Sequence, residues 1–185
     1  MKVTKAQAQA NRAHIVETAS SLFRERGYDG VGVADLMAAA GFTHGGFYKH
    51  FGSKADLMAE AAACGLASSA ARSEGVDLAD FLGQYLSREH RDNPAGGCTL
   101  AALSNDAARQ PEAVKTVFAQ GLEQLLQTLQ AAGGPIDTAD EKAQRARRLS
   151  VIATLVGAIT LSRACPDDSP LADEILEACR KRLLT

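Results

Sequence analysis

The segment from Thr43 to Lys54, THGGFYKHFGSK, gathers side chains that could bind the phosphates and bases of nucleic acid. Hydrogen-bond donors of these types commonly hold phosphate oxygens on either side of a DNA groove. Gly45 and Gly46 add almost no side-chain bulk, so the backbone there can approach a surface closely. Each costs about 1 kcal/mol of helix stability relative to alanine, which indicates a tertiary or functional reason for it. The donors in the segment are His44, Tyr48, Lys49, His50 and Lys54.

Two helical patterns with a turn between them must position these groups. In the first pattern, residues 33–40, the apolar residues repeat with the spacing of one helix face. Gly41 then ends the helix in a left-handed conformation, and Phe42 is placed to fill the angle between two helices. We expect the hydroxyl of Thr43 to accept from the amide of Gly45 or Gly46 and so to cap a second helix over about residues 44–50. Phe47 and Phe51 share its inner face, and the whole predicts a helix-turn-helix.

A wider set of residues resembles the N-terminal domain of the TetR/AcrR family of transcriptional repressors over about residues 8–60. The resemblance implies an all-α fold of about nine helices, in which a three-helix helix-turn-helix DNA-binding domain precedes a C-terminal helical domain for ligand sensing and dimerisation. One departure is Val31-Gly32, where the family usually has Ser or Thr opening its second helix. The set is Ile15, Ala19, Leu22-Phe23, Gly27-Tyr28, Val33, Ala40-Gly41, Thr43, Phe47-Tyr48-Lys49-His50-Phe51, Lys54 and Leu57.

The same resemblance assigns roles to the DNA-binding residues. It implies that His44, Gly45 and Gly46 face the major groove and that Thr43 caps the helix or holds a phosphate. It further implies a homodimer on a palindromic operator, released by a small molecule or a reactive species. The remaining residues assigned to DNA are Tyr48, His50 and Lys54 on phosphates, with Lys49 on the same polar side.

Charge is distributed unevenly along the chain. Residues 1–54 hold seven Lys and Arg against four Asp and Glu, whereas residues 55–185 hold thirteen against eighteen. The net charge of −2 therefore hides a basic N-terminal part. This bias is modest, so few phosphate contacts per subunit are expected and affinity should depend on a dimer.

We divide the chain into a DNA-binding domain, residues 1–54, and a regulatory and dimerisation domain, residues 55–185. The last two helices should pair with those of a second copy, because residues 149–161 are apolar on nearly every side and need cover on every side. A central core helix in a monomer is the alternative. The expected helices run over about residues 9–27, 33–40, 44–50, 54–69, 78–91, 98–109, 111–131, 138–163 and 170–184.

Cys98 is the residue of the regulatory half that invites a chemical hypothesis. It follows Gly96-Gly97 and opens a predicted helix, and a helix N-terminus with Arg91 nearby could favour its thiolate. It could then sense electrophiles or oxidants, although small buried cysteines are common. Phe81, Tyr85 and Phe118 are candidates for lining an effector pocket, although each could equally be plain core.

Other classes of function find little support in the sequence. No nucleophile elbow, phosphate-binding GxxxxGK loop or HExxH motif occurs, so we expect no enzyme, and neither a cofactor nor a metal. The four cysteines lack metal-ligand spacing. No leader and no run of eighteen apolar residues occurs, so a cytoplasmic protein without a membrane partner is expected. An architectural DNA-binding protein without a ligand stays open as an alternative.

Overall fold

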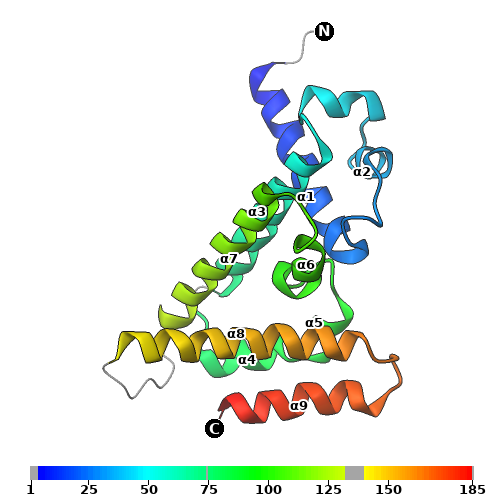
Figure 1. Ribbon diagram of the computed structural model, residues 1–185. Helices are drawn as coiled ribbons and strands as arrows, with labels where there is room; N and C mark the ends of the chain where they lie inside the picture. The colour runs from blue at the N-terminus through cyan, green and yellow to red at the C-terminus, as the bar shows by residue number, and fades with distance from the viewer. Residues whose placement is uncertain (1–3, 74, 132–139, 185) are drawn as a thin grey trace.

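The computed structural model describes residues 4–73, 75–131 and 140–184, and these form helices joined by turns, with no strand among them (Figure 1). The all-α prediction is confirmed. None of the described helices is long and apolar enough to cross a membrane. The elements are α1 (Lys5–Arg26), α2 (Val33–Ala39), the 3₁₀ helix η1 (His44–Lys49), α3 (Lys54–Ser73), α4 (Leu78–Tyr85), α5 (Arg88–Asp92), α6 (Thr99–Ala107), α7 (Glu112–Ala131), α8 (Glu141–Arg163) and α9 (Pro170–Leu184).

The helices form a head and a base joined by a long pair. α1, α2 and η1 form the head, α8 and α9 run antiparallel at the base, and α3 and α7 pack side by side between them (Figure 1). α3 also packs along α1, and α6 sits in the middle against α1, α3, α7 and α8. A shift at the base can therefore reach the head through two packed layers.

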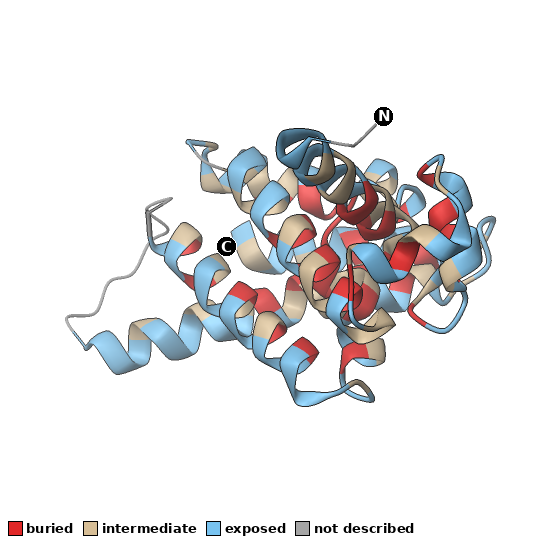
Figure 2. Ribbon diagram, turned by 90° about the horizontal axis from the view of Figure 1, so that it is seen from above, coloured by how far each residue is buried: buried red, intermediate tan, exposed pale blue. Residues whose placement is uncertain are grey.

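The core follows the inner faces of these helices. The fully buried side chains include Ile15 and Phe23 of α1, Phe47 of η1, Leu103 of α6 and Ile159 of α8. Figure 2 shows buried residues on the faces that meet, whereas the first turns of α8 project from the body and are mostly exposed. Burial of such side chains is the main favourable term of folding.

The head confirms most of the predicted helix-turn-helix. Gly41 has a φ of +79°, the left-handed conformation expected of it. Phe47 and Phe51 are buried with ring centroids 5.4 Å apart. The predicted cap at Thr43 is wrong, because its side chain makes no capping hydrogen bond and its carbonyl instead accepts from the amide of Gly46 at 2.9 Å. The second helix is correspondingly a tight 3₁₀ helix.

Two further boundaries differ from the sequence prediction. α1 begins at Lys5 rather than near residue 9, because the hydroxyl of Thr4 accepts from the amide of Gln7 at 3.2 Å and caps it. The single helix expected over residues 78–91 is two helices, since Ser87 caps a new start by accepting from the amide of His90 at 3.1 Å. The expected start of α8 at residue 138 lies outside the described residues.

Candidate nucleic-acid interface and effector pocket

The outward face of η1 is polar and has no role inside the protomer. Thr43, His44, Gly45 and Lys49 are exposed, and Tyr48 keeps 69% of its surface accessible. The opposite face of the same short helix is fixed in the core by Phe47. A short helix that is fixed in the core on one side and carries exposed hydrogen-bond donors on the other is suited to contacting a phosphate backbone and base edges.

The two glycines of η1 differ in their surroundings. A Cβ on Gly46 would lie 3.5 Å from Cε of Met37 in α2, so Gly46 has a packing contact within the head. A Cβ on Gly45 would meet nothing within 4 Å. Helix propensity disfavours glycine there, and the protomer supplies no packing reason for it. The backbone at Gly45 is therefore open to close approach.

Two basic residues of the head are held by contacts within the protomer. Lys54, expected to hold a phosphate, donates from Nζ to the carbonyl of Tyr28 at 2.5 Å and lies 5.9 Å from the ring centroid of Phe23. Arg12 of α1 forms a two-pronged ion pair with Glu60 of α3. His50 is half-buried. Of the residues predicted to contact DNA, Thr43, His44, Gly45, Tyr48 and Lys49 are therefore the exposed ones.

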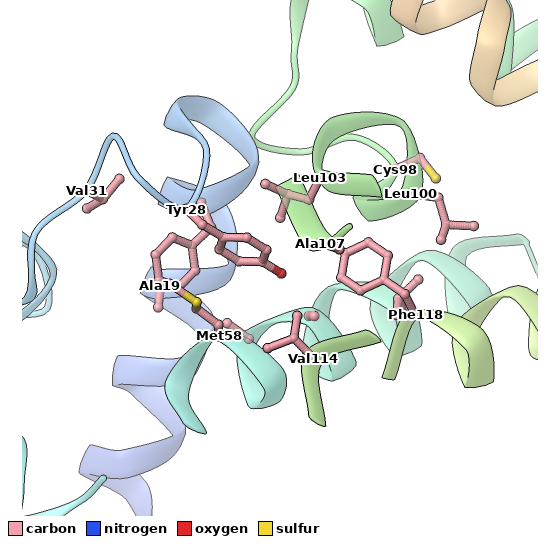
Figure 3. Packing of buried hydrophobic residues seen from close by; sticks show 14 of the residues in the cluster. Ala19, Tyr28, Val31, Met58, Cys98, Leu100, Leu103, Ala107, Val114 and Phe118 are labelled. Atoms are coloured by element: carbon pink, nitrogen blue, oxygen red, sulfur yellow. The ribbon is translucent and has the colours of Figure 1, made fainter. Parts of the chain in front are cut away.

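The head is joined to the regulatory half by specific polar contacts. Asp106 of α6 accepts from the backbone amide of Tyr28 at 3.0 Å. Arg24 of α1 donates from Nε to the carbonyl of Ala95, in the loop before α6, at 2.8 Å. Figure 3 shows the ring of Tyr28 reaching under α6 toward Ala107 and Val114. The head therefore rests on α6 and on the loop that precedes it.

Gly65 marks the point where α1, α3 and α6 cross. A Cβ added to it would lie 2.4 Å from Oγ1 of Thr99, 2.5 Å from Nη1 of Arg24 and 2.8 Å from Oγ of Ser20. Ser20 and Thr99 are buried, and burial lowers the pKa of the Arg24 guanidinium. Only a residue without a side chain leaves room for this polar crossing.

A pocket of about 600 Å³ opens beside the loop before α6. It contains three of the four predicted sensing residues, Phe81, Tyr85 and Cys98. Phe118 lines a separate apolar hollow of about 560 Å³ between α6, α7 and α8. The first pocket has a size typical of small-molecule sites and combines apolar walls with a few polar groups. Its lining also includes Leu66, Arg72, Glu89, His90, Leu100, Gln124 and Leu125.

The polar side of this pocket is arranged around His90. Its Nε2 accepts from the amide of Cys98 at 3.0 Å, so the proton lies on Nδ1, which donates to the carbonyl of Tyr85 at 2.7 Å. Burial, with the charges of Arg163 and Arg72 nearby, lowers the pKa of His90. The neutral ring therefore links α4, α5 and the N-cap residue of α6.

Cys98 stands at the start of α6, as expected, and is buried at 9% exposure. The expectation that Arg91 supports it is wrong. The Arg91 guanidinium donates to the carbonyls of Ser162 and Cys165 at the end of α8 and pairs with Asp92. Arg24, Arg72, His90 and Gln124 were missed, because on their own helices they read as ordinary polar positions.

The outer face of α8 and α9 carries apolar side chains without cover. Leu161 and Leu171 keep 61% and 52% of their surface accessible, and a Cβ on Gly157 would meet nothing within 4 Å. Leu176 of α9 is buried within the protomer. Exposed leucines on packed helices are typical of an interface.

These features define a helix-turn-helix protein with a separate helical domain, and comparisons identify its family. The model for "Bacterial regulatory proteins, tetR family" matches residues 15–61. The uncharacterized HTH-type transcriptional regulator Rv0196 of Mycobacterium tuberculosis is 31% identical over 184 residues, covering 88% of this chain and 89% of that protein. The chain belongs to the TetR family, whose members are DNA-binding transcriptional regulators.

One further relative matches part of the chain in sequence, and one solved structure matches its fold. The HTH-type transcriptional regulator AcrR of Shigella flexneri is 40% identical over 57 residues, which cover 31% of this chain. The match spans about a quarter of the length of AcrR, 26%. The crystal structure of the reduced form of NemR from E. coli has a TM-score of 0.74 at 19% identity and covers 94% of this chain and 95% of NemR. That likeness concerns the fold alone.

Proposed function

We propose that the protein is a transcriptional repressor that binds a palindromic operator as a homodimer and leaves it when an effector occupies the regulatory half. The observation that carries this proposal is the exposed polar face of η1, Thr43 to Lys49, mounted on the buried Phe47. In this proposal His44, Gly45 and Gly46 approach base edges. Tyr48, Lys49 and His50 hold phosphates, and Lys54 does so after leaving the Tyr28 carbonyl.

Two observations support dimerisation through α8 and α9: the low net charge of a single head, and the exposed apolar surface of these two helices. The N-terminal 54 residues carry a net charge of only +3, so one head binds weakly. Two heads on one DNA face would combine their contacts. The exposed leucines of α8 and α9, with the open surface at Gly157, support these helices as the shared face.

The connection between pocket and head supports an effector-released repressor over an architectural protein without a ligand. Arg24 of the head is bonded to the carbonyl of Ala95, and three residues later Cys98 forms part of the pocket. An occupant that moves this loop therefore acts directly on α1. An architectural protein has no use for a pocket connected in this way.

A sensor that reacts through Cys98 is a second candidate, favoured by the position of that cysteine in the same pocket and at the same loop. Alkylation or oxidation there would enlarge the side chain beneath the Arg24 contact. In either version residues 1–54 act as the DNA-binding domain and residues 55–185 as the regulatory domain. Because the protein meets DNA, we expect it in the cytoplasm.

The decisive experiment is selection of DNA fragments by the purified protein, followed by titration of the selected sequence at several salt concentrations. We expect a palindromic site with half-sites one helical turn apart, and affinity that falls as salt rises. Binding without sequence preference would favour the architectural protein. No DNA binding at low salt would contradict the proposal.

A further inference from the structure

Three arginines from three distant helices converge on the turn and loop around residues 90–98. Arg24 bonds to the carbonyl of Ala95, and Arg72 of α3 donates from Nη2 to the carbonyl of Gly96 at 3.2 Å. Arg163 of α8 donates from Nη2 to the carbonyl of His90 at 2.8 Å. All these acceptors are neutral carbonyl oxygens. The three positive charges therefore surround one wall of the pocket.

No carboxylate in the described part of the chain pairs with any of the three arginines. Arg24 and Arg163 are half-buried, and burial lowers the pKa of each guanidinium, whereas Arg72 is exposed. Among the described residues that line the pocket, Glu89 is the one carboxylate, and it is exposed as well. Three guanidinium groups without an ion-pair partner make this wall positive, so it favours an anion.

Tyr85 supplies a second, independent indication of a ligand. It is buried at 8% exposure and forms part of the pocket wall, and its hydroxyl has no well-formed hydrogen bond among the described residues. Burial raises the pKa of this phenol, and the neighbouring Cys98 thiol adds to the rise. An unpaired buried hydroxyl costs stability unless something satisfies it. A carboxylate accepts hydrogen bonds from both a phenol and a guanidinium.

Apolar side chains form another side of the pocket. Leu66 of α3, Phe81 of α4 and Leu125 of α7 provide its walls, and the volume of about 600 Å³ suits a molecule with a sizeable carbon skeleton. Of the three arginines, only Arg72 lines the pocket. One accessible guanidinium beside apolar walls fits a single negative charge better than a polyphosphate.

We propose that this pocket binds a small organic monocarboxylate, with its carboxylate toward Arg72 and Tyr85 and its apolar body against Leu66, Phe81 and Leu125. This inference rests on the proposed function and names the chemical class of its effector. Binding exchanges the Arg72–Gly96 hydrogen bond for one to the ligand. The loop held by Arg24 then shifts, and the head moves with it.

The test uses matched pairs of acids and amides. Octanoate, 4-phenylbutyrate and the corresponding amides are titrated into the purified full-length protein by isothermal calorimetry. We expect the acids to bind at least about tenfold more tightly than the amides, because the charged group gains charge-assisted hydrogen bonds. Equal affinity of acid and amide, or no acid binding up to millimolar concentration, overturns the proposal.

Single substitutions separate the contacts. Arg72→Gln and Tyr85→Phe should each weaken octanoate binding by about tenfold. Tyr85→Phe should also raise the melting temperature of the ligand-free protein, because it removes an unpaired buried hydroxyl, so weaker binding cannot be ascribed to misfolding. Glu89→Gln removes the negative charge at the pocket and should bind octanoate at least as tightly as wild type. Unchanged binding by Arg72→Gln and Tyr85→Phe contradicts the assignment.

Two parallel measurements separate this inference from other outcomes. Octanoate should leave the wild-type protein on dialysis, which distinguishes a reversible acid from a reagent that modifies the thiol. Binding of the ligand-free protein to its selected DNA is measured at the same time. Protein that binds DNA but no acid overturns the inference and leaves the proposed function standing. Protein that binds acids but no DNA overturns the proposed function instead.

Discussion

Asp106 of α6 accepts a hydrogen bond at 3.0 Å from the backbone amide of Tyr28, the second residue after α1. The carbonyl of the same Tyr28 accepts from Lys54 at 2.5 Å. One peptide segment is thus held from the regulatory side by a carboxylate and from the start of α3 by an ammonium group. The orientation of the head depends on both.

The first prediction concerns this contact. Asp106→Ala leaves the Tyr28 amide without its partner and should lower the free energy of unfolding by about 1–3 kcal/mol. Affinity of the ligand-free protein for its operator should change little, whereas release by an effector should become weaker, because the head is no longer tied to α6. Urea unfolding and fluorescence anisotropy with labelled operator measure the two effects.

Arg109→Ala is the matched control. It removes the ion pair between Arg109 and Asp106, whose nitrogen and oxygen lie 2.8 Å apart, and leaves the bond to Tyr28 in place. Surface ion pairs of this kind contribute about 0–1 kcal/mol. If Arg109→Ala impairs effector release as much as Asp106→Ala does, the Tyr28 contact is not the connection.

A second prediction contrasts two helical glycines. Gly→Ala within a helix normally stabilises by about 1 kcal/mol. At Gly65 the new Cβ would meet Thr99 and Arg24 within 2.5 Å, so Gly65→Ala should instead lower the free energy of unfolding by about 1–2 kcal/mol. Gly83 in α4 has nothing within 4 Å of that position, and Gly83→Ala should stabilise. Thermal denaturation of both variants measures the signs, and equal signs would contradict the packing argument.

The sequence predicted the elements whose signals are local. The apolar spacing that put Phe47 and Phe51 on one face and the glycine that ends α2 are both confirmed. The break at Ser87 was missed because the apolar spacing ends at Leu86 and the polar residues after Ser87 continue without a glycine or proline until Pro94, although a serine is itself a capping residue.

The site was less predictable where it depends on distant residues. Arg24 and Ala95 are 71 positions apart, and the sequence around neither residue predicts their hydrogen bond. Lys54 looked like a free cation on a helix start, and only the fold brings it to the Tyr28 carbonyl. Phe81, Tyr85 and Cys98 could be named as candidates one by one, but not as neighbours in a single pocket.

A third prediction addresses the exposed face of η1. Lys49→Ala should weaken binding to all DNA sequences alike and reduce the slope of log affinity against log salt by about 1 for each phosphate that the protein no longer holds. Tyr48→Phe should weaken binding with little change of slope, since it removes no charge. His44→Ala should alter base preference in a repeated selection.

Lys54→Ala carries an additional expectation, because Lys54 also stabilises the head. It should lower the melting temperature as well as DNA affinity, whereas Lys49→Ala should leave the melting temperature unchanged. Wild-type affinity in the combined Tyr48→Phe, Lys49→Ala and Lys54→Ala protein would exclude this face from the interface.

A fourth prediction addresses assembly. Gly157 faces open space in the protomer, so Gly157→Arg creates no clash within one chain. Any change in the molecular mass measured in solution must then come from a partner subunit that packs on the same face. We expect wild-type dimers at micromolar concentration and monomers for Gly157→Arg, because a buried unpaired charge at close helix contact is strongly unfavourable. Light scattering after size exclusion measures both.

The consequence for DNA binding follows from geometry. Two heads must reach successive major grooves about 34 Å apart, so the monomeric variant should protect a single half-site and bind far more weakly. Arg180→Ala, on an exposed position of α9, serves as a surface control. A wild-type protein that is monomeric in solution would contradict the assembly proposed for α8 and α9.

The last prediction tests Cys98 as a reactive sensor. Its backbone amide is already bonded to His90, and its side chain lies at the pocket, so a reagent that enters the pocket can reach it. Alkylation forms a bond between the thiolate sulfur and the reagent, and the added bulk must displace the loop tied to Arg24. N-ethylmaleimide should therefore release wild-type protein from its operator at concentrations that leave Cys98→Ser bound.

The other three cysteines serve as controls: Cys64→Ser, Cys165→Ser and Cys179→Ser should respond like wild type. If Cys98→Ser and wild type respond identically, the thiol is not the sensor and reversible binding in the same pocket accounts for regulation.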